Sequence, residues 1–207
     1  LSVHGIKPGD RVGTFMWNNY RHLELYQAVP SMGAVLHTLN IRLSSFDLEY
    51  IINHAQDRVI FIDEDLLPLL EPVLKNTPSV ELLIVARHGG SETSNFGMQI
   101  DYEAFISPHA TSYPWPEIDE NSPMGLCYTS GTTGKPKGCQ INNRNFYNYL
   151  SWSNEYFKDN THKRVGYFSP LSFDFTLTSI FGSFISGSNL LISDEDTSIM
   201  TELNLLI

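Results

Sequence analysis

The sequence is organised around one stretch, Tyr128-Thr129-Ser130-Gly131-Thr132-Thr133-Gly134-Lys135-Pro136-Lys137-Gly138. These eleven residues include three glycines, four aliphatic hydroxyls, two lysines and one proline. Glycine lets a backbone turn tightly and approach a ligand, and successive N–H groups in such a turn form a concave anion site. The preceding residues 123–127 are apolar enough to form a short buried strand. The stretch therefore predicts a turn that wraps an anion at the end of a strand, and a polyphosphate is the natural ligand.

The side chains of the turn add to this prediction. Ser130, Thr132 and Thr133 supply hydroxyl donors, and two lysines supply positive charge at the end of the turn. The competing interpretation is an ordinary polar surface loop. The turn is not a Walker A motif, because that motif needs four residues between its glycine and the Gly-Lys pair. Here two residues separate Gly131 from Gly134, and Pro136 follows the first lysine.

Composition narrows the function classes. Lys and Arg number 13 and Asp and Glu number 23, which gives a net charge of −10 and argues against a nucleic-acid or anionic-membrane surface. Cys127 and Cys139 flank the turn without metal-ligand spacing, and we expect two buried, reduced thiols. No signal peptide and no apolar run of about 18 residues is present, so we expect a cytoplasmic protein with no membrane span.

The first half of the chain alternates between strand and helix patterns. Strands are predicted over residues 11–17, 33–37, 58–63 and 80–86, and helices over 20–32, 46–55 and 65–75. Pro30 should end or kink the first helix, and Ser45 is the expected N-cap of the second, with Glu49 near its first turn. The alternation predicts an α/β fold of mostly parallel sheets flanked by helices. Ligands of such sheets bind beyond the carboxyl ends of the strands, where residues 128–138 fall if 125–129 is a strand.

The second half continues the pattern after a break. A polar, glycine-rich loop is expected over 87–97, a short helix over 101–106, and an extended linker over 107–123. After the turn we expect strands over 139–142, 165–169 and 189–193 and helices from about 143 to 157 and over 173–186. Asn143 or Asn145 is the expected cap of the first of these helices, and Gly187 ends the second. The predicted organisation is an α/β subdomain portion over 1–122 and a second, over 123–207, that holds the turn.

Residues 128–138 resemble the phosphate-binding signature of the adenylate-forming superfamily, the AMP-dependent synthetases and ligases. The superfamily includes acyl-CoA synthetases, luciferases and the adenylation domains of nonribosomal peptide synthetases. Residues 11–73 resemble the acyl-CoA synthetase branch, most clearly at 33–40, as does the segment 123–138. The resemblance implies a partial N-terminal domain of such an enzyme, cut at both ends, whose missing C-terminal part would supply the adenine, ribose and Mg²⁺ contacts.

From about residue 145 the chain instead resembles an amino-acid adenylation domain, at residues 148–152 and 171–176. Asp174 occupies the position at which amino-acid activators hold the substrate ammonium. The alternative for Asp174 is an acid favoured by a helix N-terminus. The sequence departs from the family at Asn143-Arg144, where many members carry His-Arg. That change is compatible with a helix start but not with a role for the imidazole.

The implied chemistry has two half-reactions. A carboxylate attacks the α-phosphorus of ATP and pyrophosphate leaves, and a thiol then takes the acyl group from the acyl-adenylate. In this assignment Lys137 is catalytic, and a set of residues binds the nucleotide: Thr129, Ser130, Gly131, Thr132, Thr133, Gly134, Lys135, Lys137 and Gly138. Mg²⁺ would bridge phosphate oxygens, with no protein ligand assigned to it.

Three functions stay open. The first is an AMP-forming ligase that joins a carboxylic acid, of the fatty or another organic type, to coenzyme A. The second is an amino-acid adenylation domain whose acceptor is a phosphopantetheinyl carrier protein. The third is a non-catalytic module that keeps the turn. The 207 residues alone are expected to lack full turnover, because half of the implied site is absent.

Overall fold

The computed structural model describes residues 1–87, 96–129, 134–156, 164–167 and 176–192. In these residues a mixed sheet has the strand order β5-β4-β3-β1-β2-β6-β7. Its strands are β1 (Arg11–Phe15), β2 (Val35–Thr38), β3 (Asp57–Asp63), β4 (Leu82–Ala86), β5 (Gln99–Asp101), β6 (Pro123–Thr129) and β7 (Lys137–Asn142). All neighbouring pairs are parallel except β6 and β7, which are antiparallel. The prediction of a mostly parallel α/β sheet is therefore confirmed.

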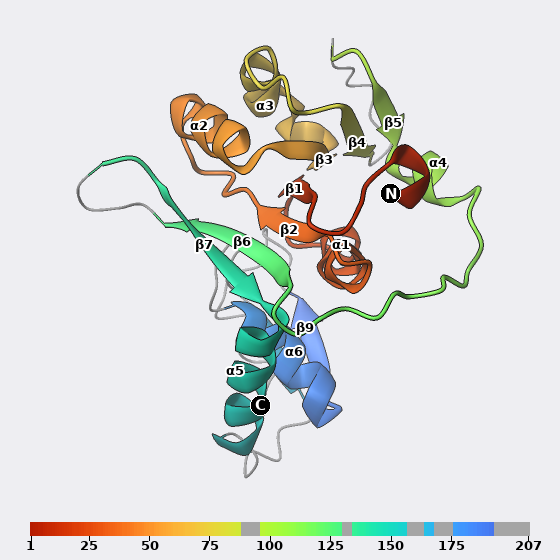
Figure 1. The fold of residues 1–207 in the computed structure, drawn as a ribbon, viewed down its shortest axis with the longest axis vertical. Helices are drawn as coiled ribbons and strands as arrows, with labels where there is room; N and C mark the ends of the chain where they lie inside the picture. Colours follow the sequence, from red (N-terminus) through yellow and green to blue (C-terminus); the bar gives the residue numbers. More distant parts are fainter. Residues whose placement is uncertain (88–95, 130–133, 157–163, 168–175, 193–207) are drawn as a thin grey trace.

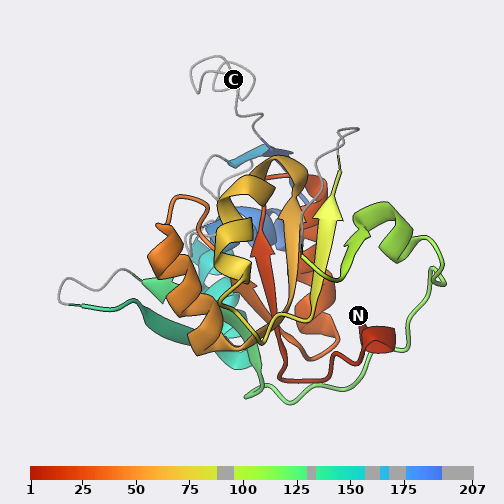
Figure 2. The same ribbon diagram turned by 90° about the horizontal axis from the view of Figure 1, so that it is seen from above.

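Helices cover both faces of this sheet (Figure 2). They are η1 (Ser2–His4), α1 (Tyr20–Ser31), α2 (Ser45–Ala55), η2 (Glu64–Leu66), α3 (Leu67–Leu74) and α4 (Tyr102–Ile106). Alternate residues of β3 enter different cores, with Val59 and Phe61 on the α1 and α4 side and Ile60 and Ile62 on the α2 and α3 side. Burial on both faces explains why the strands form nearly continuous apolar runs.

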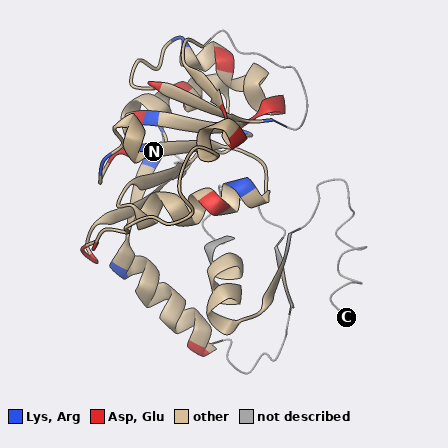
Figure 3. Cartoon of the chain, turned by 90° about the vertical axis from the view of Figure 1, so that its right-hand side faces the viewer, with Lys and Arg blue, Asp and Glu red and all other residues tan. Residues whose placement is uncertain are grey.

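The remaining elements form a smaller unit beside the large sheet (Figure 1). They are α5 (Asn143–Tyr156), β8 (Arg164–Tyr167), α6 (Thr176–Ser186) and β9 (Asn189–Ile192), with β8 and β9 forming a parallel pair. Ile180 of α6 is buried in the core that α1 shares with the large sheet. Figure 3 shows that most charged residues lie on the large sheet and its helices, whereas α5 and α6 carry few. The smaller unit is therefore joined to the sheet by an apolar contact.

Several boundaries differ from the sequence prediction. Ser44, not Ser45, caps α2, because its hydroxyl accepts the N–H of Asp47, which also takes the first-turn place expected for Glu49. The predicted helix over 65–75 begins as the 3₁₀ turn η2. Strand β5 was not predicted, and its last residue, Asp101, caps α4.

The start of α5 also differs from prediction. The side chain of Asn142 accepts the N–H of Asn145 at 2.8 Å. The cap is therefore Asn142 rather than Asn143 or Asn145, the two predicted residues. The Asn143 side chain donates to the carbonyl of Ser122, and the Arg144 N–H donates to the carbonyl of Glu120 at 2.7 Å. The Asn-Arg pair thus ties the first turn of α5 to the end of the linker, which agrees with its predicted helix-start role.

A buried histidine links β1 to α1. His22 is 1% exposed and lies between the Trp17 carbonyl, which faces Nδ1 at 3.1 Å, and the Thr14 hydroxyl, which faces Nε2 at 2.9 Å. The carbonyl can only accept, so Nδ1 carries the proton and Nε2 accepts from Thr14. Burial lowers the pKa of His22 to about 4, because a charged imidazole loses its hydration there.

We predict that His22 makes folding acid-sensitive. The unfolded chain takes up a proton near pH 6.5 and the folded chain only near pH 4, so stability present above pH 6.5 is lost as the pH falls towards 4. The loss amounts to about 3 kcal/mol of unfolding free energy. Urea unfolding of His22→Gln should show a shallower pH dependence over this range, with exposed His109→Gln as the control. Equal slopes in His22→Gln and the parent protein would contradict the assignment.

Candidate nucleotide-binding hairpin

The predicted anion-binding turn lies at the tip of the β6–β7 hairpin. Strand β6 runs parallel to β2 and ends at Thr129, and β7 returns antiparallel from Lys137 (Figure 1). The expectation that the turn follows the carboxyl end of a strand is confirmed. Ser130, Gly131, Thr132 and Thr133 lie outside the described residues, and so does Asp174.

The described part of the turn is exposed. Thr129, Gly134, Lys135 and Lys137 are all exposed to solvent, and Thr129 faces Lys137 across the hairpin. Gly134 has a φ of +152°, a backbone conformation that residues other than glycine rarely adopt. No atom lies within 4 Å of the position that a Cβ would occupy there. The tip therefore offers backbone and cationic groups to solvent rather than to the core.

The first lysine of the turn contacts α2. The Nζ of Lys135 lies 5.0 Å from the centre of the Tyr50 ring, within the range of a cation–π interaction. The Tyr50 ring in turn stacks on His54, with centroids 5.5 Å apart. Tyr50 and His54 are four residues apart on α2, so they share one helix face, and this face holds the end of the hairpin.

Tyr128 fixes the hairpin to the body of the sheet. Its hydroxyl forms a 2.6 Å hydrogen bond with Nδ1 of His54, and its ring centroid lies 5.1 Å from that of His37 on β2. Burial raises the pKa of Tyr128 to about 12, with a smaller contribution from the nearby Asp57 carboxylate. Tyr128 is thus a neutral phenol at any physiological pH, and it joins β6 to both β2 and α2.

A buried hydrogen-bonded pair lies next to the Tyr128 ring. Nδ1 of His37 is 2.7 Å from Oδ2 of Asp57, and both side chains are fully buried. Nε2 of His37 has no hydrogen-bond partner among the described residues. A buried pair of this kind holds its geometry firmly, because separating the partners would leave further polar groups unpaired in the interior. It gives the Tyr128 ring a rigid surface to pack on.

Gly138 has a packing role that the sequence did not reveal. It lies opposite Tyr128 in β7, and a Cβ at this position would approach the ring Cζ to 3.1 Å and Cδ1 of Leu126 to 3.3 Å. The Tyr128 ring therefore lies closely over β7 at a position where the absence of a side chain leaves room for it. The predicted phosphate contact of Gly138 remains a prediction, whereas this steric requirement follows from the structure.

We predict that Gly138→Ala destabilises the hairpin through Tyr128. Overpacking of this kind costs about 1–3 kcal/mol of unfolding free energy. The cost should be clearly smaller in a Tyr128→Ala background, where only the Leu126 contact remains. Gly97→Ala is the control, because nothing lies within 4 Å of its Cβ position. Urea unfolding of the four combinations measures the coupling. An equal cost with and without the tyrosine ring would show that the contact is not the cause.

The two cysteines do not match their prediction. Cys127 is half-buried and Cys139 is exposed, so the expectation of two buried thiols is wrong. Strand β7 is an edge strand of the described sheet, and side chains on such an edge remain open to solvent.

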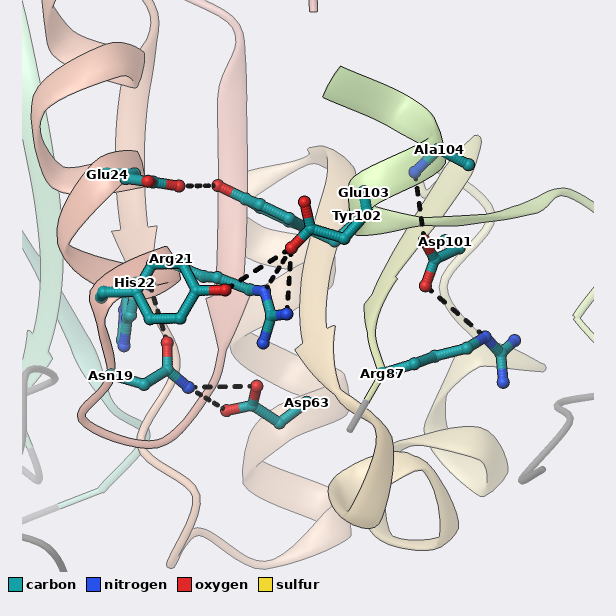
Figure 4. A network of polar contacts seen from close by, with 11 residues as sticks. Asn19, Arg21, His22, Glu24, Asp63, Arg87, Asp101, Tyr102, Glu103 and Ala104 are labelled. Atoms are coloured by element: carbon teal, nitrogen blue, oxygen red, sulfur yellow. Dashed lines mark hydrogen bonds and ion pairs between the residues drawn. The ribbon is translucent and has the colours of Figure 1, made fainter. Parts of the chain in front are cut away.

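A second group of polar residues lies at the carboxyl ends of β1 and β3, where the strand order reverses (Figure 4). Ligands of doubly wound sheets commonly bind at such a reversal. Here the Asp63 carboxylate accepts the Trp17 N–H at 2.7 Å and the Asn19 amide at 3.0 Å. Arg21 pairs with Glu103 at 2.9 Å and thereby ties α1 to α4. The chain thus satisfies these polar groups with its own side chains.

Within the described ranges, no three or more His, Cys, Asp or Glu side chains are arranged to hold a metal ion. Over the same ranges, no helix combines the length and apolarity that crossing a bilayer requires.

The fold and the hairpin define an α/β protein with an exposed, glycine- and lysine-containing turn at the carboxyl edge of its sheet. The family model described as AMP-binding enzyme matches residues 1–206. The chain therefore belongs to the AMP-binding enzyme family, within the adenylate-forming superfamily that the sequence indicated.

Individual relatives agree with this placement. A medium-chain-fatty-acid–CoA ligase of Ectopseudomonas oleovorans is 42% identical over 145 residues, covering 70% of this chain and 27% of the relative. A 3-methylmercaptopropionyl-CoA ligase of Ruegeria lacuscaerulensis is 41% identical over 169 residues, covering 81% and 30%. The crystal structure of the anthranilate–CoA ligase AuaEII with anthranoyl-AMP superposes with a TM-score of 0.81 at 22% identity, covering 99% of this chain and 38% of that one. The chain thus spans about three tenths of the length of the curated relatives it matches.

Proposed function

We propose that the protein carrying this chain is an AMP-forming acid–CoA ligase. Family membership and two CoA ligase relatives at about 40% identity support this function. The observation that supports it at the residue level is the hairpin, whose turn follows the carboxyl end of β6 and is rich in hydroxyl and lysine donors in sequence. Its described residues Thr129, Gly134, Lys135 and Lys137 are exposed. We infer that residues 129–138 bind the β- and γ-phosphates of ATP.

In this proposal the hairpin acts by positioning and charge. ATP enters as its Mg²⁺ complex, with the ion on phosphate oxygens. The backbone N–H groups and hydroxyls of the turn hold the phosphate tail while a carboxylate oxygen attacks the α-phosphorus. Negative charge grows on the departing pyrophosphate, and Lys135 and Lys137 offset it. Coenzyme A then takes the acyl group through its thiol, and AMP leaves.

The two lysines have different surroundings. Lys135 lies over the Tyr50 ring of α2, so it must exchange this contact for a phosphate oxygen. Lys137 begins β7 and is exposed beside Thr129, so it is fixed at its backbone by the hairpin ladder. We therefore assign the larger share of charge stabilisation to Lys137.

We predict that Lys137→Ala in the full-length protein lowers the rate of ATP–pyrophosphate exchange that depends on the carboxylic acid substrate, by about a hundredfold. Loss of one preorganised group that stabilises developing charge has an effect of this size. Lys75→Ala removes an exposed lysine at the end of α3 and should leave the exchange unchanged. Exchange at the parent rate in Lys137→Ala would remove this lysine from the mechanism.

The remaining question of the proposed function is which carboxylic acid the protein activates. The names of the relatives favour fatty or other small organic acids, whereas Asp174 is the residue that an amino-acid activator would use for the substrate ammonium. We expect exchange to respond to medium-chain fatty acids and short organic acids and not to amino acids, with Asp174→Asn having little effect. Exchange that requires an amino acid and fails in Asp174→Asn would establish the adenylation-domain function instead.

A further inference from the structure

The two cysteines occupy directly opposite positions in the β6–β7 ladder. Cys127 pairs with Cys139, between the pairs Leu126–Gln140 and Tyr128–Gly138. The only irregularity in this register lies between Pro123 and Gly125, outside the cysteine pair. Two thiols therefore face each other across the hairpin that carries the turn.

This register meets the geometric requirement of a disulfide. Opposite residues of an antiparallel pair have Cα atoms about 4.5–5.5 Å apart and side chains on the same side of the sheet. Disulfides form between Cα atoms about 4.4–6.8 Å apart. The bond can therefore form with little movement of either strand.

The cysteine side of the hairpin is distinct from the tyrosine side. Sγ of Cys127 lies 3.9 Å from the Thr38 hydroxyl of β2, whereas the next residue, Tyr128, packs on His37 and His54. Successive residues of a strand face opposite sides, so the Cys127–Cys139 pair lies on the face away from α2. A bond there leaves the Tyr128 contacts in place.

We propose that Cys127 and Cys139 form a reversible intrachain disulfide that fastens the two strands of the hairpin next to its turn. The oxidant is a low-molecular-weight disulfide such as oxidised glutathione. Cys139 is exposed and reacts first: its thiolate attacks one sulfur, forms a mixed disulfide and releases one glutathione. The half-buried Cys127 then attacks the Cys139 sulfur and releases the second glutathione. The two cysteine protons end on the two released thiols, so atoms and electrons balance.

The bond itself is tested in the full-length protein at rising ratios of oxidised to reduced glutathione. Blocking of remaining thiols, non-reducing digestion and mass spectrometry should find the peptides containing Cys127 and Cys139 linked within one chain, and dithiothreitol should separate them. The linked species should be absent from Cys127→Ser and Cys139→Ser. A lasting glutathione adduct on Cys139, or a bond between two chains, would overturn the proposal.

A register control tests the geometry. In the double variant Cys139→Ser, Gln140→Cys the new thiol pairs with Leu126 and points to the other side of the sheet. This variant still has two cysteines in the hairpin, yet it should not form the linked species. Equal linkage in this variant would show that proximity along the chain, rather than the strand register, controls the reaction.

The consequence is tested by amide hydrogen exchange of the paired residues 126–129 and 137–141. The bond closes the hairpin on itself, so strand separation no longer exposes these amides, and exchange in the oxidised protein should slow at least about tenfold. Exchange in Cys127→Ser should not respond to glutathione. Unchanged exchange in the linked protein would show that the bond does not fasten the strands. This inference goes beyond the proposed ligase function, and an inactive protein would leave its outcomes unaffected.

Discussion

The packing of the Tyr128 ring is the contact on which the placement of the hairpin depends. The ring lies against His37 of β2, its hydroxyl bonds to His54 of α2, and it crosses β7 at Gly138. One side chain of β6 thus reaches two other strands and a helix. Strand β7 is an edge strand of the described sheet, so no further strand supports the hairpin on that side. The packing of Tyr128 supports it from one face instead.

The surroundings of this ring explain the order of residue types in the motif. Tyrosine is needed where the strand ends because it combines a flat apolar body with a hydroxyl that reaches His54. Glycine is favoured opposite it because a Cβ there would come within 3.1 Å of the ring. Between them lie the small and cationic residues of the turn. The motif therefore encodes a support for the hairpin as well as the turn that we propose binds phosphate, and the support is the part visible in the described residues.

Strands and helices could be predicted from the sequence, whereas contacts between segments far apart in the chain could not. Apolar runs such as Val59 to Ile62 predicted the central strands correctly, since burial on both faces demands them. The helix over 46–55 was predicted, but nothing in its sequence indicated that Tyr128 would meet His54 from 74 residues away. The three-residue strand β5 is too short to show a period, and the exposure of Cys139 depends on β7 being an edge. Each of these is a property of the assembled sheet.

The sheet presents two places at which a ligand site is expected, and their chemistry differs. At the reversal between β1 and β3, Asp63 accepts from Trp17 and Asn19, and the neighbouring Arg21–Glu103 ion pair joins α1 to α4. A ligand there would have to displace buried hydrogen bonds, and each buried polar group left unpaired costs about 1–3 kcal/mol. At the hairpin Lys135 and Lys137 are exposed. A phosphate oxygen can replace the Tyr50 ring as the partner of the Lys135 ammonium group. The polar groups at the reversal thus hold α1 to the sheet and to α4, whereas Lys135 and Lys137 are exposed at the hairpin. This difference is why we place the proposed polyanion site at the hairpin.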